Sequence, residues 1–121
     1  MDLYRELILD HYKHPRNFGT LEKPDATAQE YNATCGDRIR MEVKTANGKI
    51  EDIKFSGEGC AISQASASML TEKVKSMDTN AVMKLATDDI LALLETTLTP
   101  SRIKCAVLPL EVLQKALGAL Y

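Results

Sequence analysis

The sequence predicts an α+β fold in which helices pack on a small antiparallel β-sheet. Apolar and polar residues alternate on both sides of Asn47-Gly48, which is the pattern of a β-hairpin. Before and after this region, apolar residues recur every three or four positions, as in amphipathic helices. The strands precede a run of helices and do not alternate with them, so we expect an antiparallel sheet covered by helices.

The first element is a helix from Asp2 to Lys13. Its apolar residues at helical spacing are Leu3, Leu7, Ile8 and Tyr12. The helix should end at His14, because the residue before a proline avoids the α region. The following segment, Pro15 to Glu30, is rich in turn residues and is expected to be an irregular connection that could pair briefly as an edge strand.

The two hairpin strands are expected at 37–44 and 49–56. The inward residues of the first strand are Ile39, Met41 and Val43, and those of the second are Ile53 and Phe55. Asn47 and Gly48 both tolerate the positive φ that a tight turn between antiparallel strands requires. The polar residues between the inward ones indicate a sheet with one solvated face.

Four helices should follow the hairpin. We expect them from about Cys60 to Lys75, from Asn80 to Leu85, from Asp88 to Leu98 with Thr87 as cap, and over the apolar residues from Ile103 to Leu120. The first of these begins with closely spaced Ala and Ser residues, which let another backbone approach. Pro109 lies inside the last helix and lacks the amide that would bond the Cys105 carbonyl, so a kink or a break is expected there.

Length and composition predict one globular domain over residues 1–121. The chain has 121 residues, of which 45% are hydrophobic and 26% are charged. Its formal net charge of -2 does not favour binding to nucleic acid phosphates. No run approaches the ~20 apolar residues of a membrane span, and the N-terminus lacks the order of a secretory signal. We therefore expect a cytoplasmic protein that binds neither membranes nor nucleic acid.

Three cysteines and one aspartate are the candidate site residues. Each of Cys35, Cys60 and Cys105 is expected at the boundary of a helix or strand, where sites are commonly built. Asp37 follows Cys35 across Gly36, whose small size relieves crowding. Three thiolates and one carboxylate supply the four ligands of a tetrahedral metal site.

The residues alone leave other interpretations open. Free cysteines are often buried simply to fill space, and the spacing here is not that of paired CxxC motifs. His11 and His14 are expected to cap the first helix or face solvent and not to bind metal. Three methionines at helical spacing are expected in the core and not at a cofactor; they are Met69, Met77 and Met83.

Four motifs closely resemble those of the U-type iron–sulfur cluster assembly proteins, which include IscU, SufU and the N-terminal domain of NifU. In chain order they are Asp10-His11-Tyr12-Lys13-His14-Pro15-Arg16-Asn17-Phe18-Gly19, Asn32-Ala33-Thr34-Cys35-Gly36-Asp37-Arg38-Ile39, Gly57-Glu58-Gly59-Cys60-Ala61-Ile62-Ser63-Gln64-Ala65-Ser66-Ala67-Ser68-Met69 and Ser101-Arg102-Ile103-Lys104-Cys105-Ala106. The resemblance spans nearly the whole chain in the right order. It identifies the chain as a member of that family.

The resemblance implies an α+β domain in which Cys35, Asp37, Cys60 and Cys105 converge. It implies that these residues hold zinc or a nascent [2Fe–2S] cluster, that a cysteine desulfurase supplies sulfur, and that apo iron–sulfur proteins are the acceptors. Lys104 stands where IscU proteins carry a histidine, and the cysteine motifs are closest to SufU. The short segment before the last cysteine, with no extra insertion, is instead similar to IscU, and its string Leu98-Thr99-Pro100-Ser101-Arg102 departs from the chaperone-recognition motif of IscU.

Two functional hypotheses follow. In the first, the protein is a scaffold or zinc-dependent sulfur carrier, not a conventional enzyme, and Cys35 is the sulfur acceptor because it lies beside Gly36 at a loop–strand junction. In the second, the four residues form a closed structural zinc site, and the protein is an adaptor without sulfur-transfer activity. Acceptance of persulfide sulfur by Cys35 distinguishes the two.

Overall fold

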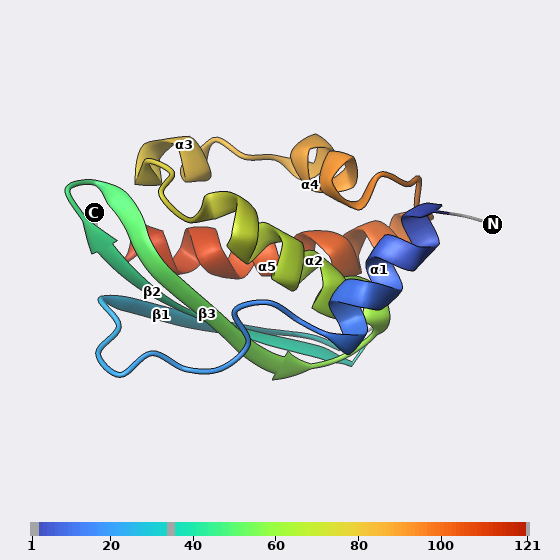
Figure 1. Cartoon of the computed structure of the whole chain (residues 1–121), viewed down its shortest axis with the longest axis horizontal. Coiled ribbons are helices and arrows are strands. Elements are labelled where there is room, and N and C mark those ends of the chain that lie inside the picture. Colours follow the sequence, from blue (N-terminus) through green and yellow to red (C-terminus); the bar gives the residue numbers. More distant parts are fainter. Residues whose placement is uncertain (1–2, 34–35, 121) are drawn as a thin grey trace.

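The fold is a three-stranded antiparallel sheet with its helices on one face, as seen in the computed structural model (Figure 1), which describes residues 3–33 and 36–120. In chain order the elements are α1 (Leu3–Lys13), β1 (Ala26–Asn32), β2 (Asp37–Ala46), β3 (Lys49–Glu58), α2 (Ala61–Val74), α3 (Thr79–Met83), α4 (Thr87–Leu94) and α5 (Pro100–Gly118). The α+β prediction is confirmed. Within the described ranges, no helix is long and apolar enough to cross a membrane.

The hairpin of β2 and β3 forms as predicted. Asn47 and Gly48 connect the strands with φ of 56° and 75°, the positive values that the turn requires. The predicted inward residues are fully buried, namely Ile39, Met41, Val43, Ile53 and Phe55. Met41 is opposite Phe55 and Val43 is opposite Ile53, and all five residues belong to the hydrophobic core.

The segment that was expected to be irregular contains a full edge strand. β1 pairs with β2 along its whole length, from Ala26 opposite Val43 to Asn32 opposite Asp37. The expected edge pairing is confirmed, but it is not brief: it covers residues 26–32, so the irregular connection ends at residue 25. The strand has few apolar residues because only one of its faces is covered, and the hydrogen bonds that hold it come from β2, which is distant in sequence.

The helices cover the inner face of the sheet in two layers (Figure 1). α2 and α5 pack directly on the strands, α1 packs on α2, and α4 lies against α2 and α5. α5 is one helix that begins at Pro100 and continues through the buried Pro109, so the predicted break does not occur. The hydroxyl of Ser66 donates to the carbonyl of Ala106 at 2.5 Å and joins α2 to α5 near this proline.

The boundaries of α4 differ from the prediction. Its N-cap residue is Ala86 and not Thr87, and the amide of Ala86 donates to the Asp89 carboxylate at 2.8 Å. The helix ends at Leu94 and not at Leu98, because Glu95 takes a left-handed conformation with φ of 54°. The apolar Leu98 lies beyond the helix and still packs on the core, which explains why periodicity extended the helix too far.

His11 is buried, contrary to the expectation that it caps a helix or faces solvent. Its Nδ1 atom lies 2.7 Å from the hydroxyl of Ser68, which also accepts from the backbone amide of Arg16 at 2.9 Å. His14 is exposed, as expected. Among the methionines, Met69 is buried and Met77 packs on the core, but Met83 is 44% exposed and is not a core residue.

The burial of His11 predicts a pH dependence of folding. Burial lowers the pKa of His11, the Arg16 charge lowers it further, and Glu72 and Asp10 oppose the shift. The unfolded chain therefore binds this proton at a higher pH than the folded protein does, and stability is lost as the pH falls through the folded-state pKa. We expect the urea midpoint to drop between about pH 7.5 and about pH 5.5. The drop in urea midpoint should be smaller in His11→Gln than in the parent chain. In His14→Gln, which alters an exposed histidine, the drop should equal that of the parent. An equal drop in all three proteins would contradict the assignment of this pH dependence to His11.

Candidate metal centre

Asp37, Cys60 and Cys105 come together at one end of the sheet. Asp37 is the first residue of β2, Cys60 directly precedes α2, and Cys105 lies in the second turn of α5. One ligand atom from each residue lies within 4.8 Å of the other two. Cys35, the fourth residue of the predicted site, lies outside the described residues. Three sequence-distant residues thus present two sulfurs and one carboxylate oxygen to one point.

The carboxylate of Asp37 is fully buried and joins β2 to the start of α2. Its Oδ1 atom accepts a hydrogen bond from the backbone amide of Cys60 at 2.8 Å. Its Oδ2 atom lies 3.8 Å from Cys60 Sγ. One oxygen therefore fixes the orientation of the carboxylate, and the other faces the sulfur of Cys60.

Cys60 is the N-cap residue of α2. Its Sγ atom accepts from the backbone amide of Ser63 at 3.5 Å, as an N-cap side chain does. The hydroxyl of Ser63 donates to the Cys60 carbonyl at 3.1 Å and lies 3.8 Å from the same sulfur. The positive end of the 14-residue helix α2 therefore faces the sulfur of Cys60.

Two glycines allow the strand to approach the site closely. Gly57 and Gly59 have φ of 137° and 155°, values that side chains of L-residues rarely permit. A Cβ atom on Gly59 would overlap Asp37 Oδ1 and lie 2.9 Å from Asp37 Cγ, and one on Gly57 would overlap the Arg38 carbonyl oxygen. Gly59 is therefore required by the space that the Asp37 carboxylate occupies, and Gly57 by the close approach of the Arg38 backbone.

Cys105 is supplied by α5. The residue is fully buried, and its thiol donates to the Ser101 carbonyl one turn earlier at 3.6 Å. Arg102 and Lys104, which precede it by three residues and by one, are exposed. The sulfur thus sits on a rigid helix, while two cations lie at the surface nearby.

The donor set fits a soft tetrahedral metal. Zinc binds thiolates at ~2.3 Å and carboxylate oxygens at ~2.0–2.2 Å, which places ligand atoms roughly 3.5–3.8 Å apart. The observed 3.8 Å between Cys60 Sγ and Asp37 Oδ2 agrees with this spacing. Three ligands leave one position for a further thiolate, a substrate or water.

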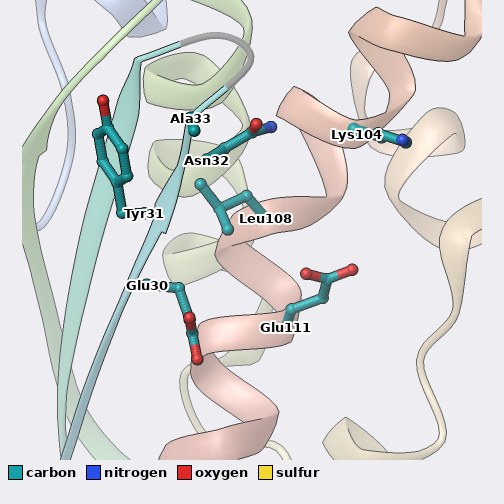
Figure 2. Close-up of a pocket in the computed structure, with 7 residues that line it drawn as sticks. All are labelled: Glu30, Tyr31, Asn32, Ala33, Lys104, Leu108 and Glu111. Atoms are coloured by element: carbon teal, nitrogen blue, oxygen red, sulfur yellow. The ribbon is translucent and has the colours of Figure 1, made fainter.

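A surface pocket adjoins this end of the molecule. It has a volume of about 340 Å³ and lies between the end of β1 and α5, lined by Glu30, Tyr31, Asn32, Ala33, Lys104, Leu108 and Glu111. Figure 2 shows the Leu108 side chain between α5 and β1. Asn32 is paired with Asp37 across the strands, and Lys104 precedes Cys105, so two of the lining residues are neighbours of the candidate ligands.

Sequence reasoning missed two residues that position the site. Ser63 supplies the amide that holds Cys60 Sγ, and Gly59 makes room for Asp37. The signal for Ser63 was its place three residues after a helix cap, and the signal for Gly59 was the pair of glycines before Cys60. The contact of Gly59 with Asp37 could be recognised only once β2 and the start of α2 were placed side by side.

Comparisons with known proteins agree with this arrangement. A family model described as the NifU-like N-terminal domain matches residues 3–121. The chain is 42% identical to the zinc-dependent sulfurtransferase SufU of Bacillus subtilis, over 96% of this chain and 90% of that protein, and 37% identical to the iron–sulfur cluster assembly enzyme IscU of Drosophila melanogaster, over 96% and 77%. The alignment with SufU covers 133 positions, more than the 121 residues here, so part of it has no counterpart in this chain.

Solved structures show the same fold. A crystal structure from Fervidobacterium islandicum, described as a candidate iron–sulfur cluster assembly scaffold for the SUF system, has a TM-score of 0.82 and 30% identity over 93% of this chain and 94% of that one. A NifU-like N-terminal protein from Brucella abortus has a TM-score of 0.78 at 21% identity, covering 95% and 92%, and supports the fold. This chain is a member of the NifU-like N-terminal domain family.

Proposed function

We propose that this protein accepts sulfur from a cysteine desulfurase and holds zinc or a nascent [2Fe–2S] cluster on Cys35, Asp37, Cys60 and Cys105. The observation that carries the proposal is the convergence of Asp37, Cys60 and Cys105 around one point. The relatives support it, since they are named as a zinc-dependent sulfurtransferase and as cluster assembly proteins. In this proposal residues 1–121 act as one domain in the cytoplasm and pass sulfur or clusters to apo iron–sulfur proteins.

The geometry supports a monodentate role for Asp37. Its Oδ1 atom is already engaged by the Cys60 amide, so Oδ2 is the atom that faces the metal position. A carboxylate is a harder ligand than a thiolate and binds soft centres less firmly. Asp37 is therefore the ligand most easily exchanged when sulfur enters or a cluster leaves, and zinc bound there would supply charge neutralisation for the thiolates.

Cys35 is proposed as the sulfur acceptor. Its thiolate attacks the terminal sulfur of the desulfurase persulfide; a new S–S bond forms at Cys35, and the desulfurase cysteine leaves as a thiolate. Cys35 follows the pocket-lining Asn32 and Ala33 by only a few residues, and this pocket is the proposed approach for the partner's cysteine. Cys105 is fully buried, which does not favour it as the first contact for the partner's cysteine.

Persulfide mapping tests the proposal against the structural zinc adaptor. The zinc-loaded protein is mixed with a cysteine desulfurase and cysteine, alkylated, digested and analysed by mass spectrometry at each cysteine. We expect an added sulfur atom at Cys35, and its loss in a Cys35→Ser variant that still folds. An unmodified Cys35 that also resists alkylation while zinc is bound would favour the adaptor.

Lys104 should influence the site only through its charge. A protonated lysine ammonium cannot bind a metal, whereas the imidazole of a histidine can. We expect Lys104→Ala to purify with the same zinc content as the parent chain, because the substitution removes only an exposed cation beside the site. Zinc content is measured by elemental analysis; a metal-free Lys104→Ala protein would show that Lys104 belongs to the ligand set.

A further inference from the structure

We infer that Cys60 and Cys105 form a disulfide when the metal is absent and a peroxide is present, so that the site is also an oxidant-sensitive thiol pair. The sulfurs of the two residues lie within 4.8 Å of one another, and neither residue is in a disulfide in the structure. The inference rests on this sulfur geometry and does not require sulfur transfer.

The two residues are placed so that a small motion of one of them suffices. Cys105 is held on α5 in the packed interior. Cys60 lies at a junction between strand and helix, directly after Gly59. Its sulfur is held only by long contacts, 3.5 Å from the Ser63 amide and 3.8 Å from both the Ser63 hydroxyl and Asp37 Oδ2. Rotation of the Cys60 side chain toward Cys105 gives up only these weak sulfur contacts and leaves the backbone bond from the Cys60 amide to Asp37 in place.

The difference in exposure assigns the two roles. Cys60 is partly exposed and can meet a peroxide, whereas Cys105 is fully buried and cannot. The sulfur of Cys60 attacks one peroxide oxygen, the O–O bond breaks, and the Cys60 thiol proton leaves with the departing oxygen as water, which leaves a sulfenic acid. The sulfur of Cys105 then attacks Cys60 Sγ, the S–O bond breaks, and the hydroxyl leaves with the Cys105 proton as a second water. Two thiols lose two electrons, and one hydrogen peroxide is reduced to two waters.

The disulfide would remove two ligands from the proposed metal site at once. A metal that occupies the site holds both sulfurs and blocks the attack on the peroxide, so metal occupancy and oxidation exclude one another. The buried Cys105 also protects Cys60 from further oxidation, because it consumes the sulfenic acid before a second peroxide arrives. Only the protection of the two sulfurs by a bound metal rests on the proposed function.

The test uses the full chain after treatment with a chelator. The protein is exposed to hydrogen peroxide at a few equivalents, the remaining thiols are alkylated, and the peptides are mapped without reduction. We expect one crosslinked peptide that joins Cys60 to Cys105, and the same crosslink in Cys35→Ser. In Cys105→Ser we expect a dimedone adduct at Cys60, because the resolving thiol is gone.

Each outcome decides between the alternatives. A crosslink from Cys60 to Cys35, or a Cys60 that reaches sulfinic acid in the parent chain, would overturn the inference. If zinc binds stoichiometrically but the chelated protein forms no disulfide, the inference fails while the proposed metal site stands. If the disulfide forms at the same rate with and without added zinc, the thiol pair is confirmed and the proposed metal site fails.

Discussion

Gly59→Ala is expected to weaken zinc binding by at least about tenfold, without touching a ligand. The new Cβ atom would overlap the Asp37 carboxylate and lie 3.0 Å from Asp37 Cα, so either the carboxylate or the strand must move. Displacement breaks the bond from the Cys60 amide, which orients both ligands. Loss of an outer contact of this kind commonly costs 10–100-fold in metal affinity. Competition with a chromophoric zinc chelator measures the loss.

Gly19→Ala is the matched control for this variant. Gly19 has φ of 140°, similar to the 155° of Gly59, but a Cβ atom there would meet nothing within 4 Å. Both variants should lose stability through backbone strain, which costs on the order of 1–3 kcal/mol. Only Gly59→Ala should lose zinc affinity. Equal zinc affinities in the two variants would show that the space beside Asp37 does not control the site.

The fold was predictable from the sequence where the pattern is local. The hairpin follows from alternation and from Asn47-Gly48, whose conformational preference needs no tertiary partner. β1 was predicted poorly because it is stabilised by pairing with β2, and its own residues carry a weak pattern. Pro109 was expected to disturb α5, but tertiary contacts on α2 and the sheet keep the helix continuous.

The buried polar contacts were the least predictable part. His11 and Ser68 are 57 residues apart, and only the packing of α1 on α2 brings them within 2.7 Å. The candidate ligand residues were predicted from motifs, because their spacing does not follow a known metal pattern. The sequence could not show that one oxygen of Asp37 is engaged by a backbone amide, since this depends on the distance between β2 and the start of α2.

The two oxygens of Asp37 have separable roles, and this makes the residue the sharpest test of the ligand set. Oδ1 holds the Cys60 amide, whereas Oδ2 faces the metal position. Asp37→Asn keeps an oxygen for the amide and loses the charge that binds zinc. Asp37→Ala loses both and leaves the Cys60 amide without its carboxylate acceptor.

Zinc is expected to raise the melting temperature of the parent chain by roughly 10 °C or more and that of Asp37→Ala by little. A ligand that binds only the folded state adds RT ln(1 + [L]/Kd), which is about 4 kcal/mol when free zinc is 1,000 times Kd. For a domain of this size, about 4 kcal/mol of added stability raises the melting temperature by roughly 10 °C or more. Thermal unfolding with excess zinc and with chelator gives the zinc-induced shift in melting temperature for each variant. The shift of Asp37→Asn should lie between those of the parent and Asp37→Ala. The shift of Lys104→Ala, which changes only an exposed charge, should match that of the parent. An Asp37→Ala protein that keeps the full zinc shift beside a Lys104→Ala protein that loses it would reverse the two roles, because it would place the missing ligand on α5 and not on β2.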